Sequence, residues 1–349
     1  MPRPQNKPGV FIIAEAGSNW KAGSPAQDWK RACELVNAAK HAGADAVKFQ
    51  TFRADSVYVP NAGSSGYLSK NGIQDSITDI FKRLAMPYEM IPRLASYCRK
   101  KKIEFMSSFF STDDFHAVDP WVRRHKIASY EITHLRLLEL AARSKKPLIL
   151  STGASTVQDI DWAVNYFYKQ GGKEISLMQC TAKYPAPLSA LNLRVIPFLA
   201  KRYGVCAGFS DHSTDALTGP VAAAALGAKI IEKHFTLNRK LKGPDHAFAI
   251  EPGELRSMVH AIRGCQAALG DGNKHVLPQE RELYFYAQRA LQAVKEISRG
   301  DILREGDNLA ILRPGSRKKG AHPRFILQAQ GRRAKRNIAL GNGIQKKDF

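Results

Sequence analysis

The sequence contains no uninterrupted apolar run long enough to cross a bilayer, and residues 1–9 do not resemble a signal peptide. Its five cysteines are scattered and lack the paired spacing of a zinc site. An odd number of cysteines without an export signal is typical of reduced thiols. We therefore expect a cytoplasmic protein that has no membrane partner.

Acidic residues are scarce relative to basic ones: the chain has 31 Asp and Glu and 53 Lys and Arg, which gives a formal net charge of +22. The basic clusters at residues 99–102, 317–319 and 332–336 could bind nucleic acid. They lack interleaved aromatic residues, and no recognisable nucleic-acid module accompanies them. A nucleic-acid-binding barrel therefore remains the non-enzyme alternative, and we favour a solvated basic surface that attracts anionic substrates.

Short apolar runs alternate with helix-like segments along most of the chain, which is typical of an α/β fold. The runs are residues 10–15, 46–50, 103–107, 126–129, 147–152, 175–180, 205–210 and 229–235. This alternation predicts a (β/α)8 TIM barrel, whose catalytic groups lie at the C-terminal strand ends. A doubly wound open sheet is the alternative, without a dinucleotide site because no Gly-x-Gly-x-x-Gly follows the first run.

The pattern changes after an expected helix at residues 254–269 and a linker at residues 270–280. Short strand-like pieces with turn signals follow, so we expect a catalytic barrel at 1–282 and a small, mostly-β domain at 283–349. The turn-rich connection at residues 53–86 is long for a barrel loop, which makes it a candidate lid.

Two histidines stand at the ends of neighbouring predicted strands. Residues 214–228 between them read as a helix, so His212 and His234 belong to one strand–helix–strand unit. Strand alternation places Ser210 with His212 and Glu232 with His234. Two imidazoles with carboxylates nearby can hold a divalent metal that keeps open positions. The alternative is a pair of structural histidines.

Nearly every other predicted strand also ends in polar residues, as the active face of a barrel does. They are Glu15, Ser18 and Asn19 after the first strand, Lys48 and Gln50 on the second, Ser107 and Ser108 on the third, Lys126, Ser129 and Glu131 on the fourth, Ser151 and Thr152 on the fifth, and Thr181, Lys183 and Tyr184 after the sixth.

These residues also form a set of ordered motifs. They are Ile13-Ala14-Glu15-Ala16-Gly17-Ser18-Asn19, Val47-Lys48-Phe49-Gln50-Thr51, Lys126-Ile127-Ala128-Ser129-Tyr130-Glu131, Leu150-Ser151-Thr152-Gly153, Gln179-Cys180-Thr181, Ser210-Asp211-His212-Ser213, Glu232-Lys233-His234-Phe235 and Gly243-Pro244-Asp245. Together they resemble the sialic acid synthase family. The tail, with Ala310-Ile311-Leu312-Arg313-Pro314-Gly315, is similar to that family's antifreeze-like (SAF) domain.

The resemblance implies an enzyme that condenses phosphoenolpyruvate with an N-acetylmannosamine-type aldose to give a nine-carbon 2-keto acid and phosphate. It also implies a domain-swapped homodimer and a Mn²⁺ or Mg²⁺ ion on His212 and His234. Phosphoenolpyruvate would contact Lys48, Gln50, Ser108, Lys126, Ser129, Ser151 and Ser210. The sugar or the reacting centre would contact Glu15, Glu131, Tyr184, Asp245 and Arg313.

Three positions depart from the family pattern: Trp20 after the first strand, Phe109 after the third, and Ala182 after the sixth. They put the identity of the sugar in doubt, and acceptors leading to neuraminic, legionaminic or pseudaminic acids all remain open. Within enzymes, the rival is a Schiff-base aldolase that uses Lys48 or Lys126. Lys233 is a poor candidate for that role, because alternation points it away from Glu232 and His234.

Overall fold

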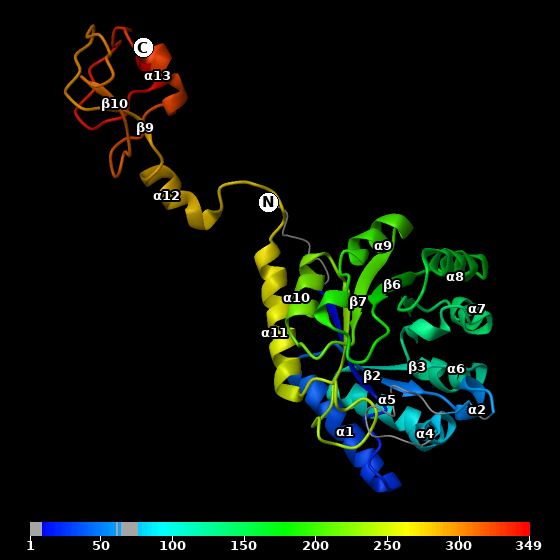
Figure 1. The fold of residues 1–349 in the computed structure, drawn as a ribbon. Helices are drawn as coiled ribbons and strands as arrows, with labels where there is room; N and C mark the ends of the chain where they lie inside the picture. Colours follow the sequence, from blue (N-terminus) through cyan, green and yellow to red (C-terminus); the bar gives the residue numbers. More distant parts are fainter. Residues whose placement is uncertain (1–8, 61, 64–75) are drawn as a thin grey trace. The chain divides into compact units, whose positions relative to one another are not determined.

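The computed structural model describes residues 9–60, 62–63 and 76–349. The chain forms two compact units, Met1–Gly270 and Asp271–Phe349, and the division falls within the expected linker. Each unit is described by itself below (Figure 1). Residues 64–75 of the candidate lid lie outside the described residues.

The first unit is built around a closed barrel in which each strand pairs in parallel with the next, and β1 pairs with β8. The strands are β1 Phe11–Gly17, β2 Ala46–Thr51, β3 Glu104–Phe109, β4 His125–Ile127, β5 Leu148–Ser151, β6 Ile175–Cys180, β7 Cys206–Asp211 and β8 Ile230–His234. The barrel prediction is confirmed, and the closed sheet excludes the open doubly wound alternative.

Helices surround the barrel on its outside (Figure 1). They are α1 Pro25–Ala42, α2 Ala54–Val57, α4 Ile77–Leu84, α5 Met90–Lys101, α6 Thr112–Val118, α7 Leu135–Arg143, α8 Val157–Lys169, α9 Val195–Tyr203, α10 Thr218–Ala225 and α11 Pro252–Leu269. The helix expected at residues 214–228 is shorter in the structure. Its first residues form a loop instead, because the Asp215 side chain accepts the backbone N–H groups of Leu217 and Thr218.

Local sequence signals explain where the longer helices begin and end. Ser24 and Gln27 form a capping box at the start of α1, which satisfies N–H groups that have no partner inside the helix. Gly43 ends α1 with a φ of 88°, a left-handed conformation that favours glycine. The apolar face between these ends, including Leu35 and Val36, is fully buried. Burial of such a side chain contributes about 1.5–3 kcal/mol.

The barrel interior changes from apolar to polar along the strands. An apolar layer consists of Ile13, Ala46, Met106, Ile149, Met178 and Ile230. Since residues i and i+2 share a face of a strand, the next inward-facing layer consists of Glu15, Lys48, Ser108, Ser151, Cys180 and Glu232. The apolar layer closes the barrel from below, and the polar layer therefore forms a buried floor at the C-terminal strand ends.

The second unit has its own small core. β9 Ala290–Ala293 pairs antiparallel with β10 Leu309–Leu312, and Leu291, Ile297, Leu303 and Ile338 are buried around them. The short helices α12 Arg281–Tyr286 and α13 Ile326–Ala329 complete the unit, with the 3₁₀ turns Pro278–Glu280, Pro323–Phe325 and Lys346–Asp348. The predicted small β domain is thus confirmed.

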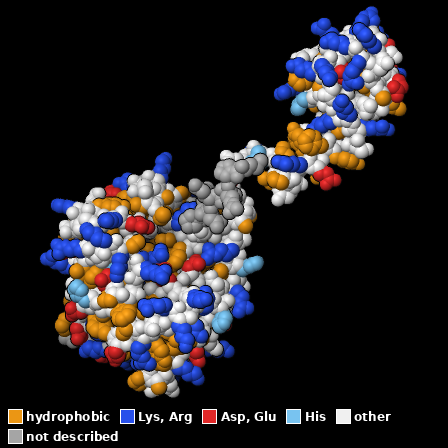
Figure 2. Space-filling model, turned by 180° about the vertical axis from the view of Figure 1, so that it is seen from behind, with side chains coloured by type: hydrophobic (Ala, Val, Ile, Leu, Met, Phe, Trp, Pro, Cys, Tyr) orange, Lys and Arg blue, Asp and Glu red, His pale blue; other side chains and the backbone are white. Residues whose placement is uncertain are grey.

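Two surface properties bear on function. No helix within the described ranges is long and apolar enough to cross a membrane. Lys and Arg side chains are spread over the visible faces of both units and do not gather into one patch (Figure 2). This distribution fits a generally basic surface better than a defined nucleic-acid footprint.

Candidate active site

The polar floor contains a buried cluster of lysines, glutamates and serines. Lys48 on β2 is 2% exposed, and its Nζ donates to Ser108 Oγ at 3.0 Å. The same nitrogen lies 2.8 Å from Glu15 Oε2 and 3.7 Å from Glu232 Oε1. The structure therefore brings together residues from β1, β2, β3 and β8 that are far apart in sequence.

Lys126 on β4 holds the other side of this cluster. Its Nζ donates to Ser151 Oγ at 2.8 Å and lies 3.8 Å from Glu232 Oε1. Ser210 Oγ donates to the same Glu232 oxygen at 3.1 Å. Glu232 thus links both lysines, yet sequence reasoning did not select it as a site residue. Its strand parity with His234 was the signal that could have found it.

Burial controls the charges of this cluster. Burial raises the pKa of Glu15 to about 7, with Lys48 opposing the shift and Glu232 adding to it. Burial alone would lower the pKa of Lys48, but the carboxylates of Glu15 and Glu232 outweigh it and raise that pKa. For Lys126, burial prevails over the attraction of Glu232 and lowers the pKa. The cluster is therefore a set of mutually dependent charges in a buried site.

The two predicted histidines lie side by side beyond this floor, with ring centroids 5.4 Å apart. His212 Nδ1 lies 2.9 Å from the carbonyl oxygen of Thr181, so donation to that oxygen leaves Nε2 free as a ligand atom. His234 Nδ1 is buried and has no hydrogen-bond partner among the described residues. A fixed tautomer and an unpartnered ring nitrogen fit a pair that takes a divalent cation.

The titration of the two rings differs. Burial and the neighbouring His212 hold the pKa of His234 well below its usual value, so this ring is neutral, as a metal ligand must be. Burial alone would lower the pKa of His212, but Cys180 and the Thr181 carbonyl outweigh it and raise that pKa. Within the described residues, no group of three His, Cys, Asp or Glu side chains is placed to hold a metal. Water or substrate would have to supply the remaining ligands.

An aromatic wall borders the histidines. The Tyr184 ring lies 4.1 Å from the His212 ring, and the Phe248 ring lies 5.1 Å from the His234 ring and 5.3 Å from Tyr184. Tyr184 was a predicted sugar contact, whereas Phe248 was missed. Phe248 lies in an irregular loop between β8 and α11, where no periodicity indicates which side chain turns inward.

Gly17 brings three predicted residues together at the end of β1. Its φ is 51°, and a Cβ there would lie 3.0 Å from Asp245 Oδ2, 3.4 Å from Glu15 Oε1 and 3.6 Å from Gln50 Nε2. Gln50 Nε2 donates to Glu15 Oε1 at 2.8 Å, and Ser18 Oγ donates to Asp245 Oδ2 at 3.2 Å. Asp245 therefore reaches the site from its distant loop.

Gly153 plays a similar part after β5. A Cβ there would lie 2.9 Å from Ser129 Oγ, 3.0 Å from Cys180 Sγ and 3.3 Å from the Ala182 Cβ. The Gly153 N–H donates to Ser129 Oγ at 3.0 Å. The predicted Ser129 is thus held beside the cluster, and Ala182 lies next to it.

Some predicted residues are not joined to the cluster. Glu131 lies in the 3₁₀ turn Ser129–Glu131, and in the described part of the chain no hydrogen bond or ion pair links its carboxylate to the lysines. Burial raises the pKa of Glu131. Arg313 is exposed at the end of β10 in the second unit. Trp20 and Phe109 are fully buried in the packing outside the barrel, which explains these departures as core residues.

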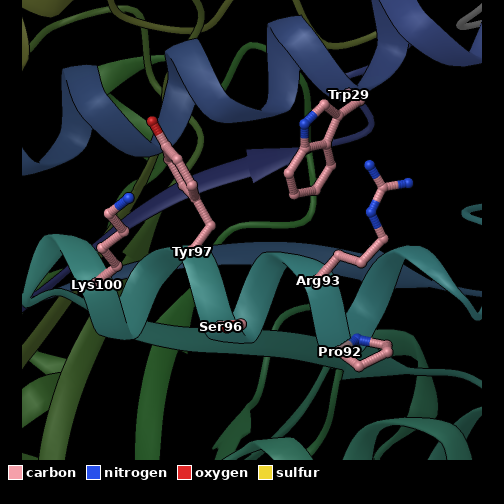
Figure 3. Close-up of a pocket in the computed structure, with 6 residues that line it drawn as sticks. All are labelled: Trp29, Pro92, Arg93, Ser96, Tyr97 and Lys100. Atoms are coloured by element: carbon pink, nitrogen blue, oxygen red, sulfur yellow. The ribbon is translucent and has the colours of Figure 1, made fainter.

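A separate groove of about 470 Å³ lies between α1 and α5, on the outside of the barrel. Figure 3 shows the Trp29 and Tyr97 rings next to one another between the two helices, with Arg93 beside Trp29. None of the predicted site residues lines this groove. The candidate chemistry is therefore placed by the buried cluster and not by this surface feature.

A parallel barrel that gathers buried ionisable groups at its C-terminal strand ends defines a (β/α)8-barrel protein with its candidate active site on that face. The NeuB family pattern matches residues 35–274, and the SAF domain pattern matches residues 288–349. The chain belongs to the NeuB family and carries a C-terminal SAF domain. This confirms the resemblance that the motifs indicated.

Individual relatives match over nearly the whole chain. It is 41% identical over 355 residues to the spore coat polysaccharide biosynthesis protein SpsE of Bacillus subtilis, covering 96% of this chain and 92% of that protein. It is 34% identical over 345 residues to pseudaminic acid synthase of Campylobacter jejuni, covering 97% and 96%. The solved N-acetylneuraminic acid synthetase of Leptospira borgpetersenii, in complex with citrate, matches with a TM-score of 0.69 and 32% identity over 80% of this chain and 91% of that one.

Proposed function

We propose that this protein is a nonulosonic acid synthase that condenses phosphoenolpyruvate with an N-acetylated hexosamine in its open-chain aldehyde form. The observation that carries the proposal is a pair of buried lysines, each bonded to a serine, beside two adjacent imidazoles. The names of the Campylobacter and Leptospira relatives support a product of the sialic acid type.

The lysine side of the site suits phosphoenolpyruvate, which carries a phosphate and a carboxylate. Lys48 and Lys126 supply positive charge, and Ser108, Ser151 and Ser210 supply hydroxyl donors. Charge-assisted hydrogen bonds in a dry site are stronger than neutral ones. The backbone N–H of Gly153 already fixes Ser129 beside these groups, which adds another hydroxyl.

The histidine side suits the aldehyde. His212 and His234 would hold a Mn²⁺ or Mg²⁺ ion, which supplies Lewis-acid polarisation of a carbonyl oxygen when bound. The Thr181 carbonyl fixes the His212 ring for this role. Tyr184 and Phe248 form an apolar boundary that turns the reactive end of the sugar toward the lysine cluster.

We assign a proton transfer of the condensation to a buried carboxyl group of the chain. Carbon three of phosphoenolpyruvate bonds to the aldehyde carbon with the electron pair of its double bond, which leaves carbon two cationic, and the aldehyde oxygen becomes a hydroxyl with the proton that the added water releases. Water adds to carbon two and gives its proton to a carboxylate, for which Glu15 is the buried candidate. The carbon–oxygen bond to phosphate then breaks, leaving a 2-keto acid and inorganic phosphate.

The residues that line the sugar side of the site would select the acceptor by their shape and hydrogen bonds. Asp245 can bond its hydroxyls, and the small Ala182 and the aromatic wall set the space around its acyl groups. Precursors of neuraminic, legionaminic and pseudaminic acids are all within this class. We further propose that the chain works as a domain-swapped homodimer, in which Arg313 of one subunit reaches the sugar of the other.

Phosphate release from phosphoenolpyruvate, measured against a panel of N-acetylated hexosamines and their 6-deoxy diacetamido analogues, tests the proposal. We expect release that depends on one acceptor and produces an equal amount of 2-keto acid. Lys48→Met serves as the control, in which release at a low phosphoenolpyruvate concentration should fall sharply. Absence of acceptor-dependent release across the panel, in a folded protein supplied with Mn²⁺, would contradict the assignment.

A further inference from the structure

Lys233 on β8 is a buried lysine that the proposed chemistry does not use. Its side chain is 1% exposed, and alternation places it on the opposite face of the strand from Glu232 and His234. A buried ammonium group is costly unless its partners satisfy it. The partners of Lys233 therefore show what the residue holds in place.

All the partners of Lys233 lie around one short segment after β7. Its Nζ donates to Asp211 Oδ2 at 2.6 Å, to the Ser213 carbonyl at 2.6 Å and to the Asp215 carbonyl at 2.8 Å. Asp211 also accepts the Ser213 N–H at 2.8 Å. The chain is thus tied down on both sides of His212, the residue between Asp211 and Ser213.

The same lysine immediately precedes His234 in the sequence. Lys233 and Asp211 are register partners in the β7–β8 pairing, so the ion pair also joins the two strands that lead to the histidines. Other anchors of His212 come from the end of β6 and the chain after it: Cys180 and Thr181 at the ring, and the Ala186 N–H on the His212 carbonyl. Lys233 therefore links the backbone on both sides of His212 to the backbone that carries His234.

Packing from outside keeps this network dry. A Cβ at Gly219, in α10, would lie 3.3 Å from Asp211 Oδ2 and 3.0 Å from Leu191 Cδ1. The helix thus lies directly on the ion pair, and a water molecule has little room to replace the ammonium group. Loss of Lys233 would take the ammonium donor away from two carbonyl groups and would leave the Asp211 carboxylate with donors from Ser213 alone.

We propose that Lys233 is a positioning residue that sets the spacing and orientation of the His212–His234 pair from the outer face of the barrel. This rests on the proposed function, in which the pair holds the divalent cation. The lysine itself touches neither substrate nor cation, and its effect passes through the segment Asp211-His212-Ser213.

Mn²⁺ binding to the full chain, measured by electron paramagnetic resonance of free Mn²⁺, tests this role apart from turnover. Lys233→Met removes the ammonium group and keeps the length of the side chain. Lys146→Met is the matched control, because Lys146 bonds Asp119 at 2.9 Å and precedes β5, at the opposite end of the strands. We expect Mn²⁺ affinity to fall about ten-fold or more in Lys233→Met and to stay unchanged in Lys146→Met.

Histidine ring signals in nuclear magnetic resonance spectra of the metal-free chain give a second readout. The His212 and His234 signals, assigned from the alanine variants, should move in Lys233→Met and stay in place in Lys146→Met. Unchanged affinity and unchanged ring signals in a folded Lys233→Met protein would overturn the proposal. If that variant does not fold, Asp211→Asn replaces it under the same criteria. If the unaltered chain binds no Mn²⁺, the metal part of the proposed function fails, and the ring signals alone decide the role of Lys233.

Discussion

Lys48 lies within ion-pair distance of Glu15 and Glu232, and Lys126 lies within that distance of Glu232. All four side chains are buried, so each charge depends on its neighbours. Removing one member of such a group leaves a partner buried and uncompensated, which typically costs about 3–5 kcal/mol of folding stability. Folding and ligand affinity therefore have to be measured together for every variant of the cluster.

Lys48→Met and Lys126→Met should each weaken phosphoenolpyruvate binding and spare the aldose. Loss of one hydrogen bond to a charged group costs about 1.5–3 kcal/mol, which corresponds to a Kd raised roughly ten- to hundred-fold. Isothermal titration with phosphoenolpyruvate measures the change, and circular dichroism confirms folding. Unchanged affinity in both folded variants would show that the anion binds elsewhere. Trapping of a stable substrate adduct by borohydride would instead favour the Schiff-base aldolase.

His125 at the start of β4 predicts acid sensitivity of the barrel. Burial lowers its pKa to about 4, although Asp119 opposes the shift. Between pH 6.5 and 4 the unfolded chain therefore binds this proton more readily than the folded chain, and stability falls as the pH falls. The full loss is roughly 3 kcal/mol. Urea unfolding should give a difference in the free energy of unfolding between the unaltered chain and His125→Gln. This difference should be smaller at pH 5 than at pH 7. A difference that does not change with pH would contradict this account.

At the scale of elements, the ends of β7 and β8 form a unit because the two strands pair and both carry a histidine just above the polar floor. Along each strand the apolar layer, the polar layer and the histidine follow one another at steps of two residues, which is the period of a strand. His212 and His234 are the residues of this unit that would hold the proposed divalent cation.

Chelation should therefore abolish phosphate release, and added Mn²⁺ or Mg²⁺ should restore it. His212→Ala or His234→Ala should lower kcat in a folded protein, because each removes one of the two imidazole ligands. The measurement is phosphate release after treatment with a chelator and metal replacement. Full activity of the folded double variant without metal would refute the cation role.

Strand periodicity explains how much of this site could be predicted from the sequence. Glu15, Lys48, Ser108 and Ser151 lie where alternation places them, because a buried parallel strand leaves little freedom in side-chain direction. Phe248 and the Thr181 carbonyl escaped prediction, because they come from irregular loops whose course is set by tertiary contacts. The shorter α10 has the same origin, since Asp215 and Lys233 hold the preceding loop.

At the scale of the whole molecule, the two units have separate cores joined by a segment that leaves large apolar side chains uncovered. Leu283 and Phe285 in α12 are 64% and 61% exposed. Exposed apolar residues are ordinary on a protein surface, and the proposed assembly predicts that these two become covered when a partner binds. A second copy of the chain is the partner that the proposed domain-swapped homodimer supplies.

Arg313 provides the test of that assembly. It stands at the exposed end of β10, before Pro314 and Gly315, and Gly315 has a φ of 56° that fixes the turn. A guanidinium held by such a turn can donate two parallel hydrogen bonds to a sugar carbonyl or carboxylate, which a lysine cannot do. Arg313→Ala should therefore raise the KM for the acceptor sugar, or abolish turnover, without changing phosphoenolpyruvate affinity.

If the arginine acts across the subunit interface, two inactive variants should complement one another. A mixture of His212→Ala and Arg313→Ala chains, unfolded together and refolded, would contain heterodimers in which one barrel with both histidines meets one intact Arg313. Random pairing puts half of the chains in heterodimers, and one of the two sites in each would be complete, so about a quarter of full activity is expected if the sites act independently. The same mixture with His212→Ala and His234→Ala is the control, because neither chain then has an intact barrel and no pairing can repair it. Size-exclusion chromatography establishes that dimers have formed. A dimeric His212→Ala and Arg313→Ala mixture that stays as inactive as this control would place Arg313 in the site of its own subunit or outside the site altogether.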